Sequence, residues 1–232
     1  ADIRDVNRNP DLFLSKGGPG LGYEGMGLML TDMDGAPHIR QRKLISSGFT
    51  PRMTKRLEDL ARKWAISIIE DALERETVEF VQDVAYKLPM HMIADILGIP
   101  KEDRDWLFTQ TNDLLLCLDP EHPVPESARE GIAAQIFGYG HKIAMQKRAQ
   151  PSDDVLSLLV TVEDEQGRLN DLELDAFFML LTVAGSETTR NAISAGLKQL
   201  LAEPEQLDAL RRDPSLMKSA TEEIIRWTSP VA

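Results

Sequence analysis

The chain has 232 residues, of which 42% are hydrophobic and 28% are charged, a composition typical of a globular protein and not of a disordered or fibrous one. Its 26 basic and 38 acidic residues give a net charge of −12, which excludes nucleic acid as an expected partner. Cys117 is the only cysteine, so an internal disulfide is excluded and we expect a reducing, cytoplasmic location. We recognise no signal peptide, transit peptide or membrane span in these residues.

The two ends of the chain read like the interior of a longer protein. The first residues, Ala1 to Val6, have the character of a helix interior and lack an initiator Met. The last residues follow Pro230, where a new element would begin. Because no internal repeat or domain linker is recognisable, we expect residues 1–232 to form a single partial domain that is truncated at both ends.

A short helix within residues 1–16, ending near Pro10, is predicted to lead into a glycine-rich segment. Six of the eleven residues from Gly17 to Gly27 are glycine, which gives the backbone high conformational entropy and predicts a mobile segment. The segment is either a plain connecting loop or a lid that takes part in binding.

Residues 34–37 predict the start of a helix, with a proline inside its first turn. His38 and Arg42 are four residues apart on this helix, so both side chains project from one face. Two donors placed in this way can hold an anion, although a plain basic helix has the same pattern. Arg40 and Lys43 lie on other faces, where we expect them to meet solvent.

The remaining segments predict a chain that is mainly α-helical. We interpret His91 as a core or capping residue and Cys117 as an inert buried thiol in a run of leucines. Asp153 and Asp154 are typical of the cap of a short buried helix. We expect an extended run at residues 78–81, a polar turn at 163–167, and helices at 51–73, 88–97, 101–118, 126–150, 155–159, 204–213 and 215–227.

The segment from Asp171 to Ala202 is the longest predicted helix, and the rest of the chain is organised around it. Residues 177–184 are apolar on nearly every face, which indicates a helix inside a protein. Asn170 and Asp171 are favourable capping residues, and Pro204 is a natural stop. A continuous helix of this length would span roughly 48 Å.

The middle of this helix breaks the rules of helix design. Gly185 costs about 1 kcal/mol relative to alanine, and Glu187 would place a charge in a buried segment. The hydroxyl of Thr188 can bond the carbonyl of Ala184 and bend the helix. These features favour either a functional groove or tight helix–helix packing with a solvated glutamate.

Glu223 and Arg226 are three residues apart in the predicted helix near the C-terminus. This spacing allows a bidentate ion pair within one helix. Taken alone, such a pair is typical of a surface salt bridge.

Three groups of motifs follow one another along the chain. His38-x-x-x-Arg42 precedes residues 48–52 (Gly-Phe-Thr-Pro-Arg), residues 184–189 read Ala-Gly-Ser-Glu-Thr-Thr, and residues 222–227 read Glu-Glu-Ile-Ile-Arg-Trp before a Ser-Pro-Val run. In this order and spacing they closely resemble a bacterial cytochrome P450, and the resemblance covers essentially the whole chain. It implies the central helices of the P450 fold, mainly α, with most of the β-sheets missing.

The resemblance implies a haem-dependent monooxygenase that uses haem b, O2 and electrons from NAD(P)H. A ferredoxin or a similar electron donor would be its redox partner, and we expect a monomer. His38 and Arg42 would hydrogen-bond the haem propionates. Ala184 and Gly185 would let the long helix lie against the haem and leave room for dioxygen.

The resemblance also gives the polar residues of the long helix a role. Thr188 would hydrogen-bond the dioxygen that the haem holds. Glu187 would bring protons in from solvent, because undirected proton delivery loses reduced oxygen as peroxide. Leu180 and Val183 would face the substrate.

Other segments resemble structural parts of the family. Glu223 and Arg226 would form a structural ion pair in the interior. The loop at residues 17–30 and the helices around residues 110–140 resemble the substrate-covering lid. Residues 29–34, 49–51 and 88–90 resemble actinobacterial enzymes that oxidise sterol side chains, so we expect an apolar, steroid-like or other lipid-like substrate.

The chain departs from the family in one respect. The haem iron of the family is bound by a cysteine in a Phe-Gly-rich loop after the Glu-x-x-Arg helix, and this sequence ends before that loop. Cys117 lacks the flanking residues of the loop, so we expect no metal ligand within the chain and no activity from the chain alone.

Two other classes of protein share part of the pattern. A non-catalytic, all-helical binding or scaffold protein would need none of the polar residues of the long helix. An isoprenoid cyclase would use Asp153 and Asp154 as metal ligands, but Ser157 stands where a third acid would be useful. A di-iron bundle is excluded because Glu-x-x-His does not occur.

Overall fold

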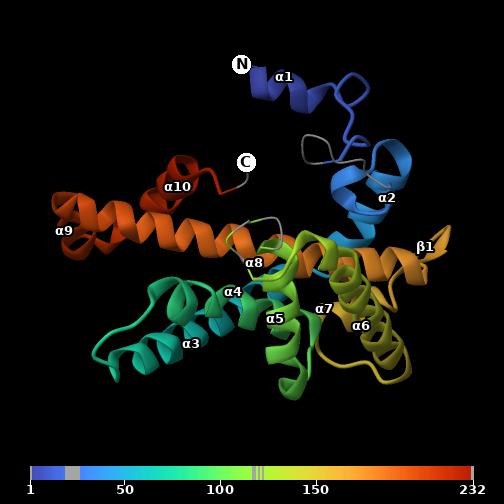
Figure 1. Ribbon diagram of the computed structural model, residues 1–232. Coiled ribbons are helices and arrows are strands. Elements are labelled where there is room, and N and C mark those ends of the chain that lie inside the picture. The colour runs from blue at the N-terminus through green and yellow to red at the C-terminus, as the bar shows by residue number, and fades with distance from the viewer. Residues whose placement is uncertain (1, 19–26, 117–118, 120, 122, 231–232) are drawn as a thin grey trace. The chain divides into compact units, whose positions relative to one another are not determined.

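The computed structural model describes residues 2–18, 27–116, 119, 121 and 123–230, and Figure 1 traces them from α1 (Asp2–Arg8) to α10 (Met217–Thr228). Between these lie η1 (Leu30–Asp32), α2 (Gly35–Ser46), α3 (Pro51–Leu73), η2 (Val81–Ala85), α4 (Lys87–Leu97), α5 (Lys101–Leu116), η3 (Glu126–Ala128), α6 (Arg129–Ala149), α7 (Val155–Leu159), α8 (Asp171–Ala202), α9 (Pro204–Arg212) and η4 (Pro214–Leu216). Within the described residues, the strands are β1 (Glu163–Asp164) and β2 (Gly167–Arg168), an antiparallel pair at the predicted polar turn. The predicted mainly α fold class is confirmed.

The chain forms two compact units. The first consists of residues 1–57 and 94–182, and the second of residues 58–93 and 183–232. Each boundary falls inside a helix and not in a loop, namely in α3, α4 and α8. None of the described helices combines the length and apolar character that a membrane span requires. The expectation of a single domain stays a prediction.

The first unit has a core built from α2, the first turns of α3, α6, α7 and the N-terminal half of α8. Each large side chain that is fully buried there stabilises the fold by about 1.5–3 kcal/mol. The buried members of the cluster are Leu44, Ile45, Met53, Ala144, Val155, Leu159, Val160, Leu169, Leu174 and Phe177.

Helix α8 has the bounds that the sequence predicts, Asp171 to Ala202. Its start is fixed by a reciprocal cap: the Glu173 amide donates to Oδ1 of Asn170 at 2.9 Å, and the Asn170 amide donates to Oε2 of Glu173 at 2.8 Å. In the apolar run 177–184, which predicted an internal helix, residues 177–179 and 182 are buried and Ala184 is exposed, so the internal position is found for part of the run only.

Helix α6 packs against this buried half of α8 through a glycine. A Cβ on Gly140 would lie 2.6 Å from the ring of Phe178, so only a glycine lets the two helices approach so closely. One residue further, Nδ1 of His141 lies 3.0 Å from Oδ2 of Asp175, a carboxylate that is only 5% exposed. The second carboxylate oxygen of Asp175 has no hydrogen-bond partner among the described residues.

Arg40 corrects the sequence analysis, which expected it to meet solvent. Its side chain is only 16% exposed and forms ion pairs with Asp164 in β1 (3.1 Å) and Glu173 in α8 (3.3 Å). It also donates to the carbonyl of Gly167 at 3.1 Å. Arg40 therefore ties α2 to the small hairpin and to the cap of α8. Hydrogen bonding from Arg40, with a backbone hydrogen bond from Gln166, holds the pKa of Asp164 below its ordinary value against the opposing effect of desolvation.

The predicted extended run at residues 78–81 is wrong. The segment leads instead into η2, a π-helical turn, because acidic side chains satisfy its first amide groups. The Glu79 carboxylate accepts hydrogen bonds from the amides of Val81 (3.3 Å) and Gln82 (2.6 Å). Such local side-chain bonds compete with strand formation.

Most other boundaries agree with the sequence to within a few residues. Helix α2 begins after Asp34 as predicted, but the Asp34 side chain does not cap it and accepts instead from the amides of Ser15 (2.8 Å) and Lys16 (2.8 Å). Residues 19–26 of the predicted glycine-rich loop and the predicted buried thiol of Cys117 lie outside the described residues.

We predict that Gly98→Ala destabilises the protein. Gly98 ends α4 with φ +63°, and an added Cβ would lie 2.3 Å from Oδ2 of Asp154 and 2.5 Å from Nζ of Lys147. Backbone strain and displacement of this buried ion pair should lower the free energy of unfolding by about 1–3 kcal/mol. Urea unfolding measures the loss.

The matched control for this substitution is Gly138→Ala. Gly138 lies inside α6, and no atom lies within 4 Å of the Cβ position. The added methyl group should raise the free energy of unfolding by about 0.5–1 kcal/mol, because alanine favours a helix interior. Equal losses for the two variants would contradict the close approach at Gly98.

A second prediction concerns the buried carboxylate of Asp175. Burial raises its pKa above the ordinary value, and the hydrogen bond from His141 lowers it by less. Because the folded pKa is the higher one, the stabilising contribution is present below the unfolded pKa of about 3.9 and is lost as the pH rises through the folded pKa. Asp175→Asn should therefore flatten the decline in the free energy of unfolding from about pH 4 towards neutrality.

Urea unfolding at stepped pH measures this difference between the wild type and Asp175→Asn. Asp208→Asn is the control, since the Asp208 side chain is 60% exposed and its charge stays hydrated on folding. Parallel curves for the wild type and Asp175→Asn would contradict the prediction.

Candidate functional site

The middle of α8 continues as a helix through Gly185 because packing compensates for its low propensity. A Cβ on Gly185 would lie 2.9 Å from Cδ1 of Ile93, which belongs to α4 in the same unit. A Cβ at this position would force the end of the Ile93 side chain to shift, so the glycine favours the close contact between these two helices in the second unit. The sequence left open whether Gly185 serves a functional groove or tight helix–helix packing, and its contact with Ile93 favours packing.

The hydroxyl groups of this segment bond back to the helix. Oγ1 of Thr188 donates to the carbonyl of Ala184 at 2.9 Å, as the sequence predicts. Oγ of Ser186 donates to the carbonyl of Val183 at 3.0 Å. Ala184 itself is exposed, so the segment presents a small side chain and a bonded hydroxyl at the helix surface.

The carboxylate of Glu187 lies at the edge of this surface. Its side chain is 36% exposed, and Oε1 lies 3.7 Å from an amino nitrogen of Arg190. The Arg190 side chain is only 7% exposed, and its guanidinium carbon lies 5.8 Å from the ring centre of Tyr86. The carboxylate thus has contact with both solvent and a buried cation.

The two donors of α2 lie in the first unit. The helix is formed as predicted, so His38 and Arg42 are four residues apart on one face. His38 is half-buried and Arg42 is exposed. Neither makes a hydrogen bond or an ion pair with any residue that the structure describes.

The predicted substrate-facing residues are both half-buried and apolar. Leu180 belongs to the first unit and Val183 to the second, because the boundary in α8 falls between residues 182 and 183.

The structure shows the ion pair of Glu223 and Arg226. Two hydrogen bonds of 2.6 Å join the guanidinium to the carboxylate. They hold the pKa of Glu223 below its ordinary value and raise the pKa of Arg226. The resemblance implied that this pair lies in the interior, but the side chains of Glu223 and Arg226 are 59% and 66% exposed. No described segment of the second unit covers this face of α10.

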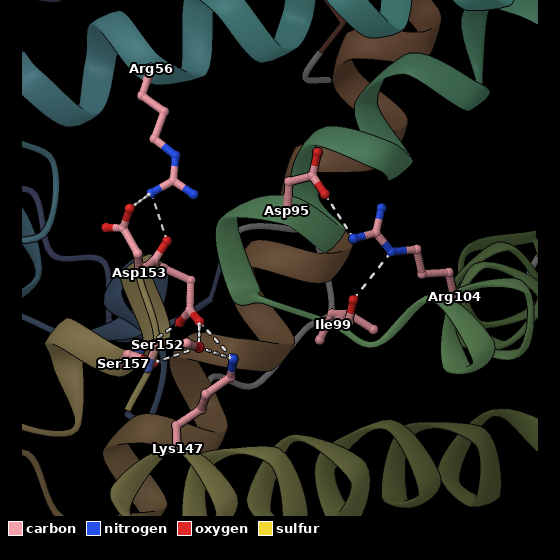
Figure 2. A network of polar contacts seen from close by, with 9 residues as sticks. Arg56, Asp95, Ile99, Arg104, Lys147, Ser152, Asp153 and Ser157 are labelled. Carbon is pink, nitrogen blue, oxygen red and sulfur yellow. Dashed lines mark hydrogen bonds and ion pairs between the residues drawn. The ribbon is translucent and has the colours of Figure 1, made fainter. Parts of the chain in front are cut away.

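Asp153 and Asp154 are occupied by basic partners and do not form the metal site of a cyclase. Nζ of Lys147 lies 2.6 Å from Oδ2 of Asp154. Arg56 pairs with Asp153 at 2.5 Å, and Figure 2 shows these two side chains pointing toward each other. Asp154 also accepts from the amide of Ser157 at 2.7 Å, which confirms its predicted role as a helix cap. Among the described residues, no group of three or more His, Cys, Asp or Glu side chains is placed to hold a metal ion.

The sequence analysis missed an apolar groove in the second unit. Its volume is about 790 Å3, and α3, the segment of residues 80–88, α8 and α10 line it. Thr188 and Thr189 are among its few polar residues, and Ile193, Leu197 and Ile224 are among the apolar ones. Apolar side chains recur every three or four residues in α8 and α10. This spacing predicts an apolar face on each helix, but it does not reveal which helices face each other.

Comparison with known proteins gives consistent matches. The model of the cytochrome P450 family matches residues 23–217. The putative cytochrome P450 126 of Mycobacterium tuberculosis is 40% identical over 215 residues, which cover 88% of this chain and 50% of that protein. A steroid C26-monooxygenase of Mycolicibacterium smegmatis is 37% identical over 232 residues, which cover 99% of this chain and 57% of that protein.

A solved structure agrees with these matches. Mycobacterium marinum cytochrome P450 CYP268A2 in complex with pseudoionone superposes with a TM-score of 0.85 at 32% identity, covering 97% of this chain and 57% of that one. The chain belongs to the cytochrome P450 family, as the motifs indicated. It spans about half the length of the curated relatives it matches.

Proposed function

We propose that this chain works as part of a haem-dependent monooxygenase, which inserts one oxygen atom from O2 into an apolar, steroid-like or other lipid-like substrate. The observation that carries the proposal is the surface of α8 at which the Thr188 hydroxyl bonds to Ala184, directly after the half-exposed carboxylate of Glu187. Membership of the P450 family supports it. Since the chain spans about half the length of its relatives, the activity is proposed for the longer protein.

The residues of α2 fit the propionates of a haem. His38 and Arg42 lie on one helical face, and neither has a partner among the described residues. Charge-assisted hydrogen bonds from such donors to a carboxylate are strong and directional. We assign the two residues to the haem propionates.

The surface of α8 around Ala184 is suited to the flat face of a haem. Ala184 is exposed and small, so a ligand can approach the helix backbone there. Gly185 contributes indirectly, because its missing side chain admits Ile93 and thereby sets the position of α8 in the second unit. When bound, the haem supplies the site at which dioxygen is reduced.

Thr188 is suited to handling a proton at this surface. Its hydroxyl proton is held by the Ala184 carbonyl at 2.9 Å, which leaves the oxygen lone pairs available to accept a hydrogen bond. Rotation of the hydroxyl would make it a donor. The neighbouring Glu187 has access to water and can exchange protons with it, so we propose that Glu187 delivers protons and Thr188 directs them.

The substrate class follows from the apolar residues and from the relatives. Leu180 and Val183 are apolar and half-buried, which suits an apolar ligand. The steroid C26-monooxygenase is 37% identical to the chain, and its name supports a steroid-like substrate here. Electrons would come from NAD(P)H through a ferredoxin or a similar donor, as the family implies.

We predict that Glu187→Gln and Thr188→Ala uncouple oxygen consumption from product formation in the full-length, haem-loaded enzyme. Loss of a proton donor should lower product formation by about 100-fold, while O2 is still consumed and leaves as hydrogen peroxide. Product, peroxide and NAD(P)H consumption are measured together.

Two further variants act as controls for this experiment. Thr188→Ser keeps a hydroxyl at the same position and should restore most of the product. Thr189→Ala removes a neighbouring exposed hydroxyl and should leave the ratio of product to peroxide unchanged. Unchanged ratios for both Glu187→Gln and Thr188→Ala would favour the non-catalytic scaffold class instead.

We also predict that the full-length enzyme responds to apolar ligands. Steroids and terpenoid ketones should shift the Soret absorption of its haem at micromolar concentrations, because they are of the size and polarity that an apolar pocket buries. A panel that includes fatty acids and small polar amides measures the selectivity. A response restricted to the small polar compounds would refute the lipid-like substrate.

A further inference from the structure

A rare backbone turn places an aromatic ring in the second unit. Residues 81–85 form the π-helical turn η2, which closes with a 2.8 Å hydrogen bond from the amide of Tyr86 to the carbonyl of Val81. Turns of this kind occur frequently at functional sites. Tyr86 directly follows the turn, and its ring lies beneath the guanidinium of Arg190, 5.8 Å from ring centre to guanidinium carbon.

Arg190 is unusual among the arginines of this chain because it is almost fully buried. The whole residue is 6% exposed. A buried guanidinium is costly unless it has partners. The ring of Tyr86 supplies one through a cation–π contact, and the carboxylate of Glu187, 3.7 Å away, supplies another.

Most exposed ion pairs between residues three apart in a helix contribute little to the stability of the protein. Asp208 and Arg211 in α9 form such a pair at 3.3 Å, with side chains that are 60% and 69% exposed. Water competes with a pair of this kind, and it restrains neither side chain strongly. In the pair of Glu187 and Arg190 the cation is fixed by burial, so only the carboxylate is free to adjust.

We propose that Arg190 is a positioning residue, which rests on the ring of Tyr86 and fixes the position of the Glu187 carboxylate on α8. The inference rests on the proposed function, because it takes Glu187 as the proton donor. A glutamate side chain at a helix surface samples several rotamers. A fixed cation on one side restricts these rotamers, so the carboxylate keeps one position relative to the helix.

The first test compares product formation with peroxide release in the full-length, haem-loaded enzyme. Arg190→Gln should lower the ratio of product to peroxide by about threefold or more, in the same direction as Glu187→Gln. Arg190→Lys keeps the charge and should restore part of the ratio. Arg211→Gln removes the cation of the matched, exposed pair and should leave the ratio unchanged.

The second test needs neither haem nor activity. A double-mutant cycle on urea unfolding of the 232-residue chain compares Glu187→Gln, Arg190→Gln and the two combined. If Arg190 holds Glu187, the shifts in the unfolding midpoint are not additive, and they become additive in a Tyr86→Leu background. Additive shifts in the wild-type background overturn the inference.

The outcomes separate this inference from the proposed function. If Glu187→Gln changes the ratio of product to peroxide and Arg190→Gln does not, the positioning role fails and the proposed function stands. If Glu187→Gln itself has no effect, the proposed proton delivery fails and the positioning role fails with it. A loss in Arg190→Gln that Arg190→Lys does not relieve at all also overturns the role of the charge.

Discussion

The uninterrupted main-chain hydrogen bonding of α8 is the constraint on which the rest of the structure depends. It begins with the reciprocal cap of Asn170 and Glu173 and continues through a segment that disfavours a helix. The helix persists at Gly185 because the missing side chain admits Ile93. The hydroxyl of Thr188 bonds to the helix itself and leaves its lone pairs available. Residues with poor intrinsic propensity are thus accommodated by packing and by local bonds.

Several basic residues of the chain connect its helices by pairing with carboxylates. Arg40, Arg104 and Lys147 are largely buried and paired with carboxylates, so they connect helices. Figure 2 shows two such connections, in which Arg104 binds Asp95 and the carbonyl of Ile99, and Lys147 binds the start of α7. His38 and Arg42 have no partner among the described residues. The structural cations are satisfied by the chain itself, whereas His38 and Arg42 are proposed to bind the haem propionates.

The sequence predicted the helices well because their signals are local. Apolar periodicity, capping residues and the stop at Gly98 act within a few residues, and they located α8 to its ends. The hydrogen bond of Thr188 was foreseeable for the same reason. The position of Arg40 was not, since its partner Asp164 is 124 residues away in sequence. The exposure of Glu223 depends on which segments pack together, and neighbouring residues do not encode that.

Two contacts among residues 184–190 depend on fixed separations along one helix. Thr188 reaches Ala184 because the two are four residues apart, and Glu187 reaches Arg190 because they are three apart. Inserting a single residue between Glu187 and Thr188 would turn everything beyond it by about 100° and advance it by about 1.5 Å, which changes both spacings at once. Many substitutions in this stretch would keep the spacing, whereas no insertion or deletion would. In homologous chains, variation here should therefore take the form of exchanged residues at constant length, while gaps should collect in the connecting loops.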